Sequence, residues 1–448
     1  MLVGGTVRDR LLGKESKDFD VEVYGLEPGR LREVLERIAR VNAVGEHFSV
    51  YKLVFFSSRT EGAQQERFEI DVSLPRRESK SGSGHRGFVI EGDPSMTFEE
   101  AARRRDFTIN AILYDPLTEE RVDPYRGVDD LQKRILRAVA SDTFVEDSLR
   151  VLRAVQLAAR FEMKIEPLTI DLCRTIDLSD LPRERIWGEI EKLLTLAERP
   201  SIGLSAAQEL GVLDKLFPEI SALASDSRYA ASTTDSAFEH TKLAIDEAAR
   251  ESRALSKPER IAVMLATLCH ELGRHRGNPT EAAKDDAVAE QTRSLLNTLG
   301  LYGVGGYDVR SQVLSLVREQ RSPAHLYERR EESIDGDFRR LASRVDIELL
   351  YHVAKSCAAV QTSPSATLAA DWFIERARAL GVEHGPPSPL LQGRHLIEAG
   401  YEPGPRMGRL LRDVYELQLE GSVTTLAEAL AAASALDSRA PKAPEVFR

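Results

Sequence analysis

The 448-residue sequence predicts an α+β fold, with a small mixed sheet and helices at its N-terminal end and a long all-helical region after it. Residues 1–137 alternate strand and helix patterns, whereas amphipathic helical patterns dominate from about residue 139 onward. We expect breaks in the helical region at 221–236, 321–333 and 381–389, where turn-forming and charged residues gather.

The first two dozen residues combine a glycine turn with closely spaced carboxylates. A short apolar strand leads into Gly4-Gly5, which opens a helix, and a second strand carries Asp18, Asp20 and Glu22. Alternate residues of a strand share a face, and carboxylates side by side are costly unless a cation neutralises them. Oxygen ligands at this spacing suit Mg²⁺, and a glycine turn at a helix N-terminus suits a phosphate. The pattern predicts a metal-dependent enzyme that acts on a nucleotide.

A third carboxylate is expected on a later strand. The segments 50–56 and 68–74 have strand patterns, and Asp71 lies on the polar face of the second. If that strand neighbours the strand of Asp18 and Asp20, the three carboxylates converge, as a two-metal site for in-line phosphoryl transfer requires. The alternative is a solvent-exposed Asp71, and the Asp18–Asp20 pair favours the metal site.

The segment 146–153 predicts a helix whose Leu149 and Leu152 face a core, with Asp147 and Arg150 on the opposite face. An intrahelical salt bridge is the simplest interpretation. The alternative is a base reader, because aspartate only accepts hydrogen bonds and arginine only donates them. Cytosine and adenine both present an amino donor beside a ring-nitrogen acceptor, whereas guanine and uracil present the opposite polarity. Such a pair accepts C and A and rejects G and U.

Five motifs in order resemble those of class II tRNA nucleotidyltransferases and bacterial poly(A) polymerases. The resemblance covers residues 2 to about 220 and rests on these segments: Gly4-Gly-x-Val-Arg-Asp9 with Asp18-x-Asp20, Arg104-Arg-Asp106 with Asn110-Ala111, Asp123-Pro with Gly127 and Asp130-Leu131, Glu146-Asp-x-x-Arg150, and Glu184-Arg-x-x-x-Glu189 with Leu193-Leu194. The family usually has more of the first strand than precedes Gly4 here, so we expect a weakened edge strand or a misassigned start.

The resemblance implies a polymerase-β-type head followed by helical domains. It implies template-independent addition of CCA to the 3′ end of tRNA from CTP and ATP, with two Mg²⁺ ions and without an obligate protein partner. The expected domains are a nucleotidyltransferase head at 1–137, a helical neck at 138–220, a body at 221–380 and a tRNA-binding tail at 381–448.

Residue roles follow at the matching positions. The resemblance implies metal binding by Asp18, Asp20 and Asp71; triphosphate contacts by Gly4, Gly5 and Arg8; a ribose-associated motif of Arg105, Asp106 and Asn110; and base selection by Asp147 and Arg150, with Arg153 also in the nucleotide site. The segment 76–94, with its glycine-rich 80–84, corresponds to a flexible loop tied to the switch from C to A addition.

The second half carries two further resemblances. His240-Thr and Cys269-His-Glu271 are similar to an HD phosphohydrolase domain, but Glu271 replaces the aspartate and later segments supply no clear ligands. We therefore expect a degenerate domain in which His240 and His270 pack between helices. Residues 392–421 resemble the tail of HD-bearing tRNA nucleotidyltransferases, where Arg406 and Arg409 are candidates for an RNA phosphate.

Composition sets further limits. The net charge of −11 argues against a protein coated with nucleic acid, but a local basic patch is compatible with it. No run of 18 apolar residues and no secretory signal pattern is found, so a membrane role is not expected. Three separated cysteines, Cys173, Cys269 and Cys357, form no disulfide framework and favour the cytoplasm.

Several alternatives share the same chemistry: an A-adding enzyme, a CC-adding enzyme and a poly(A) polymerase. The 76–94 segment argues against CC-only addition, and the HD-like body and tail favour tRNA over poly(A) synthesis. From other classes, an HD-type phosphohydrolase is disfavoured by Glu271. A non-catalytic RNA-binding protein is disfavoured because it has no need of three mutually repelling carboxylates.

Overall fold

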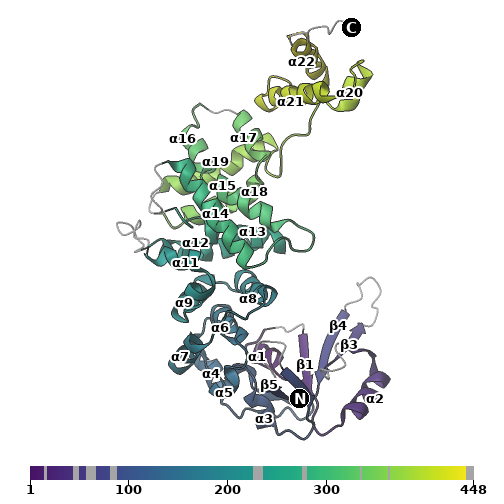
Figure 1. Cartoon of the computed structure of the whole chain (residues 1–448), viewed down its shortest axis with the longest axis vertical. Helices are drawn as coiled ribbons and strands as arrows, with labels where there is room; N and C mark the ends of the chain where they lie inside the picture. The colour runs from purple at the N-terminus through teal and green to yellow at the C-terminus, as the bar shows by residue number, and fades with distance from the viewer. Residues whose placement is uncertain are drawn as a thin grey trace, which may run out of the picture. The chain divides into compact units, whose positions relative to one another are not determined.

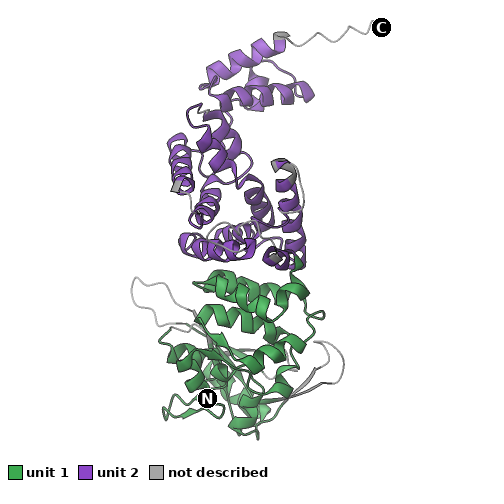
Figure 2. Ribbon diagram, turned by 90° about the vertical axis from the view of Figure 1, so that its left-hand side faces the viewer, with its two compact units in different colours: residues 1–218 green, residues 219–448 purple. Residues whose placement is uncertain are grey.

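The computed structural model describes most of the chain in two compact units, residues 1–218 and 219–448 (Figure 2). The described residues are 1–14, 18–43, 50–56, 67–80, 88–225, 236–274, 280–332, 335–361 and 364–439. The first unit contains the sheets and the second is helical in its described residues, so the predicted α+β class is confirmed (Figure 1).

A four-stranded mixed sheet in the order β1–β4–β3–β2 forms the centre of the N-terminal part. The strands are β1 (Asp18–Glu22), β2 (Arg40–Ala43), β3 (Val50–Phe56) and β4 (Arg67–Ser73). β1 runs parallel to β4, and the other two pairs are antiparallel. The strands predicted at 50–56 and 68–74 are confirmed to within one residue, and in the second the alternation of apolar and polar residues marks one buried face.

The apolar face of this sheet packs on helix α2 (Pro28–Ile38) (Figure 1). Leu31 and Leu35 of α2 form a buried cluster with Leu53 and Val72 of the sheet. Burying each such side chain contributes about 1.5–3 kcal/mol. The strand residues that alternate with these apolar ones therefore lie on the opposite, polar face, where the carboxylates are.

Two local features differ from the sequence-based expectations. The expected first strand reduces to Leu2, which forms single bridges to Val21 and Tyr114. The segment expected as a flexible loop contains an antiparallel pair, β5 (Arg76–Lys80) and β6 (Phe88–Gly92), while residues 81–87 lie outside the described part. Backbone pairing between the two flanks explains why this segment is not a simple loop.

The rest of the first unit is mainly helical. Its elements are α1 (Gly5–Leu11), α3 (Phe98–Arg103), η1 (Thr108–Asn110), β7 (Leu113–Tyr114), β8 (Arg121–Val122), α4 (Gly127–Lys133), β9 (Ile135–Leu136), α5 (Ser141–Phe144), α6 (Leu149–Phe161), β10 (Lys164–Ile165), α7 (Pro167–Thr175), α8 (Arg183–Leu196), α9 (Pro200–Glu209) and α10 (Val212–Leu216). Helix α6 packs against α8 and α9.

The helix expected at 146–153 begins only at Leu149, so its first turn was wrongly predicted. The Asp147 carboxylate accepts a hydrogen bond from the Leu149 amide at 3.1 Å and terminates the helix on that side. The expected burial of Leu149 and Leu152 is confirmed. Because Asp147 precedes the helix, it does not share a helical face with Arg150.

The C-terminal unit contains the remaining helices. They are α11 (Pro218–Ser221), which spans the boundary, η2 (Ala222–Ser225), α12 (Ala237–Glu251), α13 (Lys257–Cys269), α14 (Glu281–Thr298), α15 (Val309–Glu319), α16 (Ser322–Glu328), α17 (Asp335–Ala342), α18 (Ile347–Ala358), α19 (Pro364–Leu380), α20 (Gly393–Glu398), α21 (Pro405–Glu420) and α22 (Leu426–Arg439).

The expected breaks in the helical region have different outcomes. The break expected at 321–333 is confirmed in part: α16 occupies residues 322–328 with Pro323 in its first turn, whereas residues 329–332 belong to no helix. The break at 381–389 is confirmed, since no element lies between α19 and α20. Most of the break expected at 221–236 lies outside the described residues.

Helices α20, α21 and α22 pack around a core of their own, formed by Leu396, Met407, Leu410 and Val414 with small residues of α22. None of the described helices is both long and apolar enough to cross a membrane. All three cysteines are unbonded, as expected.

Candidate active site

The parallel pairing of β1 with β4 brings two of the predicted carboxylates together. Asp20 is in register with Asp71, and Asp18 is in register with Glu69. These residues alternate with the apolar residues that face α2, so they share the polar face of the sheet. The backbone of Asp18 is described, but its side chain lies outside the described part.

The predicted glycine turn lies directly against this face. Gly4 has φ of +69°, and a β-carbon there would meet Arg105 Nη1 at 2.9 Å and Asp20 Oδ2 at 3.5 Å. The Val3 amide donates to the Asp20 carbonyl at 3.1 Å, which holds the turn beside β1. Only glycine combines this backbone conformation with so close an approach. Gly4 therefore lets the turn approach the Arg105 guanidinium and the Asp20 carboxylate closely.

Asp71 has an unsatisfied buried oxygen. Among the described residues, its Oδ1 atom has no hydrogen-bond partner, and the Lys52 Nζ atom lies 3.6 Å from it. Lys52 also lies 3.3 Å from Glu69 Oε2. A carboxylate oxygen that accepts no hydrogen bond, beside a second carboxylate, is a suitable ligand for a hard divalent cation. Within the described side chains, which exclude that of Asp18, no group of three potential ligands is close enough to hold a metal.

Arg105 and Arg8 occupy different positions around the turn. Arg105 Nη2 pairs with Glu22 Oε1 at 2.9 Å, so its guanidinium lies between the turn and the end of β1. Arg8 is 5% exposed and donates to Asn110 Oδ1 at 2.7 Å and Asp9 Oδ1 at 2.8 Å. Burial lowers the pKa of Arg8, against the opposing effect of the Asp9 charge. Arg8 thus links α1 to η1 from inside the protein.

Asp106 is the centre of a buried polar network. It accepts hydrogen bonds from Arg153 Nε at 2.7 Å, from Asn110 Nδ2 at 3.0 Å and from the Phe107 amide at 2.8 Å. Burial raises the pKa of the Asp106 carboxyl, but the Arg153 charge and the hydrogen bonds outweigh it and lower the pKa to about 2. The network joins the segment after α3 to helix α6.

The two candidate base-reading residues have protein partners. Arg150 donates to the backbone carbonyl oxygens of Thr143 at 2.7 Å and Arg104 at 2.6 Å. Arg185 of α8 donates two hydrogen bonds to Asp147, at 3.3 Å and 3.1 Å. Sequence reasoning missed this contact, although Arg185 stands in a motif that had been singled out. These hydrogen bonds fix the Arg150 side chain in the first turn of α6 and the Asp147 side chain just before it.

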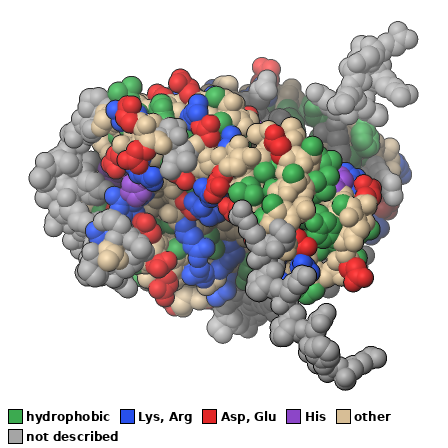
Figure 3. Space-filling model, turned by 90° about the horizontal axis from the view of Figure 1, so that it is seen from above, with side chains coloured by type: hydrophobic (Ala, Val, Ile, Leu, Met, Phe, Trp, Pro, Cys, Tyr) green, Lys and Arg blue, Asp and Glu red, His purple; other side chains and the backbone are tan. Residues whose placement is uncertain are grey.

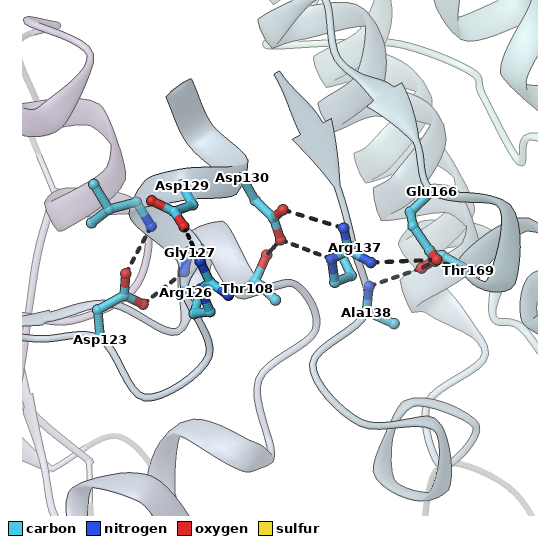
Figure 4. A network of polar contacts seen from close by, with 11 residues as sticks. Thr108, Asp123, Arg126, Gly127, Asp129, Asp130, Arg137, Ala138, Glu166 and Thr169 are labelled. Carbon is cyan, nitrogen blue, oxygen red and sulfur yellow. Dashed lines mark hydrogen bonds and ion pairs between the residues drawn. The ribbon is translucent and has the colours of Figure 1, made fainter. Parts of the chain in front are cut away.

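A second polar network fixes α4, as Figure 4 shows. The Asp123 carboxylate accepts hydrogen bonds from the first two amides of the helix, those of Gly127 at 2.7 Å and Val128 at 2.9 Å. Thr108 donates to Asp130 Oδ2 at 2.8 Å, and Arg137 Nε donates to the same atom at 3.1 Å. A β-carbon on Gly127 would come within 2.0 Å of the Thr108 carbonyl oxygen. Helix α4 therefore packs tightly against η1, which carries Asn110.

In the second unit, the HD-like residues are buried. His240 and His270 are each 3% exposed, and their ring centroids are 5.3 Å apart. His270 Nε2 lies 3.9 Å from Glu271 Oε1, and its Nδ1 lies 2.6 Å from the Thr267 carbonyl oxygen. Burial lowers the pKa of His270, but the nearby Cys357 and Glu271 outweigh it and raise the pKa to about 9. The histidines pack between helices as expected.

The tail arginines differ in their surroundings. Arg406 Nε pairs with Asp437 of α22 at 2.6 Å, whereas Arg409 lies one turn further along α21 and is exposed. Seen from above, Lys and Arg side chains gather in one band of the surface (Figure 3). A local basic surface therefore coexists with the negative net charge.

The arrangement has counterparts among known proteins. Residues 1–137 match the family described as "Poly A polymerase head domain", and residues 162–223 match "Probable RNA and SrmB- binding site of polymerase A". The four-stranded sheet with its carboxylates and the Gly4 turn all lie within residues 1–137, the part of the chain that is similar to this head domain.

Curated relatives carry the name "Multifunctional CCA protein". One from Stenotrophomonas maltophilia (strain R551-3) is 38% identical over 289 residues, which cover 62% of this chain and 65% of that protein. Another, from Xylella fastidiosa (strain 9a5c), is 36% identical over 282 residues, which cover 61% of this chain and 62% of that protein. The match thus spans just under two thirds of the relatives' length.

Solved structures show the same fold over nearly the whole chain. The Bacillus stearothermophilus CCA-adding enzyme in complex with CTP gives a TM-score of 0.60 at 20% identity and covers 98% of this chain and 93% of that chain. The Thermotoga maritima CCA-adding enzyme complexed with tRNA-CCA gives a TM-score of 0.59 at 18% identity and covers 97% of this chain and 90% of that chain. The head domain and the helical units after it therefore have the fold of CCA-adding enzymes.

Proposed function

We propose that this protein is a template-independent tRNA nucleotidyltransferase that adds C, C and A to the 3′ end of tRNA from CTP and ATP. The observation that carries the proposal is the register of Asp20 with Asp71 on one sheet face, with the Gly4 turn against it. Two carboxylates on one face, beside a glycine turn at a helix N-terminus, suit in-line nucleotidyl transfer. The names of the curated relatives and of the solved structures support this choice of substrate.

The residues that would hold two Mg²⁺ ions are Asp18, Asp20 and Asp71. The register of Asp20 with Asp71 supports this assignment, and within the described residues the Oδ1 atom of Asp71 accepts no hydrogen bond and has Lys52 Nζ at 3.6 Å. When bound, the ions would supply Lewis-acid activation of the 3′-hydroxyl and charge neutralisation at the triphosphate.

The chain's own residues then place the nucleotide. We assign the triphosphate to the Gly4-Gly5 turn, where Gly4 approaches Asp20 and Arg105 contributes a positive charge. Arg8 holds the turn rigidly from beneath through Asn110. A preorganised turn of this kind contributes to positioning without a further entropic cost at the moment of reaction.

Base choice is assigned to Asp147 and Arg150, with Asp106, Asn110 and Arg153 as their support. Asp147 presents acceptors and Arg150 presents donors, the polarity that C and A share. Their contacts with Arg185 and with backbone carbonyl oxygens hold both side chains at the start of α6. A base of the opposite polarity meets Asp147 with an acceptor and Arg150 with a donor, so its own polar edge stays unpaired, which is the physical basis of rejection.

Addition to defined transcripts tests the proposal. Purified protein receives tRNA transcripts that end before CCA, after one C, or after CC, each with Mg²⁺ and labelled CTP, ATP or both. We expect two C and then one A, with no further extension. A single A added only to the CC-ended transcript would instead identify an A-adding enzyme, and long A tails a poly(A) polymerase. The absence of any incorporation would refute nucleotidyl transfer.

The remaining assignments belong to the same proposal. Arg409 and Arg406 of α21 are RNA-phosphate candidates, and the body is a structural domain in which His240, His270 and Glu271 do not form a working HD site. The expected cytoplasmic location, drawn from three separated cysteines, also stays a prediction.

A further inference from the structure

Lys52 lies on the polar face of the sheet beside the carboxylates, and sequence reasoning did not single it out. In the antiparallel β3–β4 pair it is in register with Asp71. Its Nζ atom lies 3.6 Å from Asp71 Oδ1 and 3.3 Å from Glu69 Oε2. Its strand neighbours Tyr51 and Leu53 pack with the apolar core. The side chain is 39% exposed, so the ammonium group is accessible from solvent.

The carboxylate pair has different neighbours on its two sides. On the β1 side, the Gly4 turn approaches Asp20 Oδ2. On the β3 side, across Asp71, the nearest cation among the described residues is Lys52. Adjacent strands are about 4.8 Å apart, so Asp20 and Lys52 belong to strands about 10 Å apart with Asp71 between them. The carboxylate pair therefore has the Gly4 turn on one side and a flexible cation on the other.

The reaction geometry gives these two sides different roles. In an in-line displacement, the attacking hydroxyl and the leaving pyrophosphate lie on opposite sides of the reacting phosphorus. If the triphosphate lies over the Gly4 turn, the RNA 3′-hydroxyl must approach from the β3 side. The last phosphodiester of that RNA arrives with it, next to two carboxylates that repel it.

We propose that Lys52 is a positioning residue that binds the last phosphodiester of the RNA 3′ end. A lysine ammonium on a four-carbon stem is a mobile point charge, which suits a phosphate that advances after each addition. A half-exposed ion pair with Glu69 contributes little to stability, so structural support alone is a weak reason for a lysine here. This inference rests on the proposed nucleotidyl transfer and extends it to the RNA substrate.

A binding cycle tests the proposal with the full-length protein. The probes are two transcripts ending in CC that differ only in the last linkage, a phosphodiester or an uncharged methylphosphonate. The proteins are wild type, Lys52→Met, Lys52→Arg and the control Lys133→Met, which alters an exposed lysine at the end of α4. Fluorescence anisotropy is measured with Mg²⁺ and without nucleotide, so that no addition occurs.

We expect Lys52→Met to bind the phosphodiester RNA about 3- to 10-fold more weakly than wild type, with a salt slope lower by about 0.7. It should bind the methylphosphonate RNA as well as wild type does. Lys52→Arg should restore the affinity, and Lys133→Met should change neither RNA. In steady-state addition, Lys52→Met should raise the KM for RNA and leave the KM for CTP unchanged.

Equal weakening of both RNAs by Lys52→Met, or no weakening, would overturn the proposal. If Lys52→Met fails to fold, the affinities of wild type and Lys52→Arg for the two RNAs are compared instead. Equal affinity of these proteins for the phosphodiester and the methylphosphonate RNA would refute the contact between Lys52 and the last phosphodiester. Wild-type addition of CCA to the transcripts is read separately. Its failure would count against the proposed function, whereas its success with a negative binding cycle would reject only the role of Lys52.

Discussion

Asp106 is the residue at which the structure makes its sharpest energetic prediction. The Asp106→Asn substitution keeps the shape of the side chain and removes its charge. The carboxylate is 7% exposed and holds Arg153, Asn110 and the Phe107 amide. Removing the charge leaves the Arg153 guanidinium without its main partner. We therefore expect Asp106→Asn to destabilise the first unit.

The size of the effect follows from the pKa of Asp106, which falls from 3.8 to about 2 in the folded protein. A shift of this size corresponds to about 2 kcal/mol of unfolding free energy. Because the folded pKa is lowered, this stability is present above pH 4 and is lost as the pH falls toward 2. At pH 3 about half of it remains. The stability gap between wild type and Asp106→Asn should therefore narrow by about 1 kcal/mol between pH 7 and pH 3.

The two tryptophans allow this to be measured on the relevant unit. Trp372→Phe leaves Trp187 of α8 as the single tryptophan, and α8 packs against α6, which carries Arg153. Urea unfolding is followed by Trp187 fluorescence at pH 7, 5 and 3 in this background, with and without the Asp106→Asn substitution. Asp171→Asn serves as the control, because Asp171 is 71% exposed in its pair with Arg174. If the difference in unfolding free energy between the proteins with and without Asp106→Asn stayed constant with pH, the ionised state assigned to Asp106 would be refuted.

Four further substitutions test the site and its supporting helices. Asp20→Asn should reduce nucleotide addition more than about 100-fold while leaving tRNA affinity and thermal stability near wild type; substantial residual addition would contradict a metal role. Gly127→Ala should destabilise by about 1–3 kcal/mol, because its β-carbon would overlap the Thr108 carbonyl oxygen. Gly188→Ala lies in the middle of α8, where a β-carbon would meet open space, so it should raise the free energy of unfolding by about 0.5–1 kcal/mol in the same urea assay. If both glycine substitutions changed the free energy of unfolding in the same direction, the packing argument would be contradicted. Arg150→Ala should alter C and A selectivity in competition assays more than the KM for total nucleotide; unchanged selectivity would exclude base reading.

Local sequence patterns determined which residues face the core and which face solvent. The alternation along 68–74 predicted that strand and the polar side of Asp71, because side-chain direction in a strand has a period of two. The Gly4-Gly5 turn and the carboxylates of β1 were recognisable for the same local reason. The predicted mixed-sheet head and helical remainder followed from where these periods change.

Only the tertiary structure decided which of these residues meet. The parallel pairing of β1 with β4, strands far apart along the chain, sets Asp20 beside Asp71, and the alternation pattern does not encode strand order. Asp147 lies outside α6 because its carboxylate bonds the Leu149 amide, a choice that competes with helix formation. The contacts of Lys52 with Asp71 and of Arg185 with Asp147 join elements distant in the chain. The periodicity of apolar residues in the sequence specifies which face of each helix or strand is buried. Which residues of different elements come into contact depends on how those faces pack against one another.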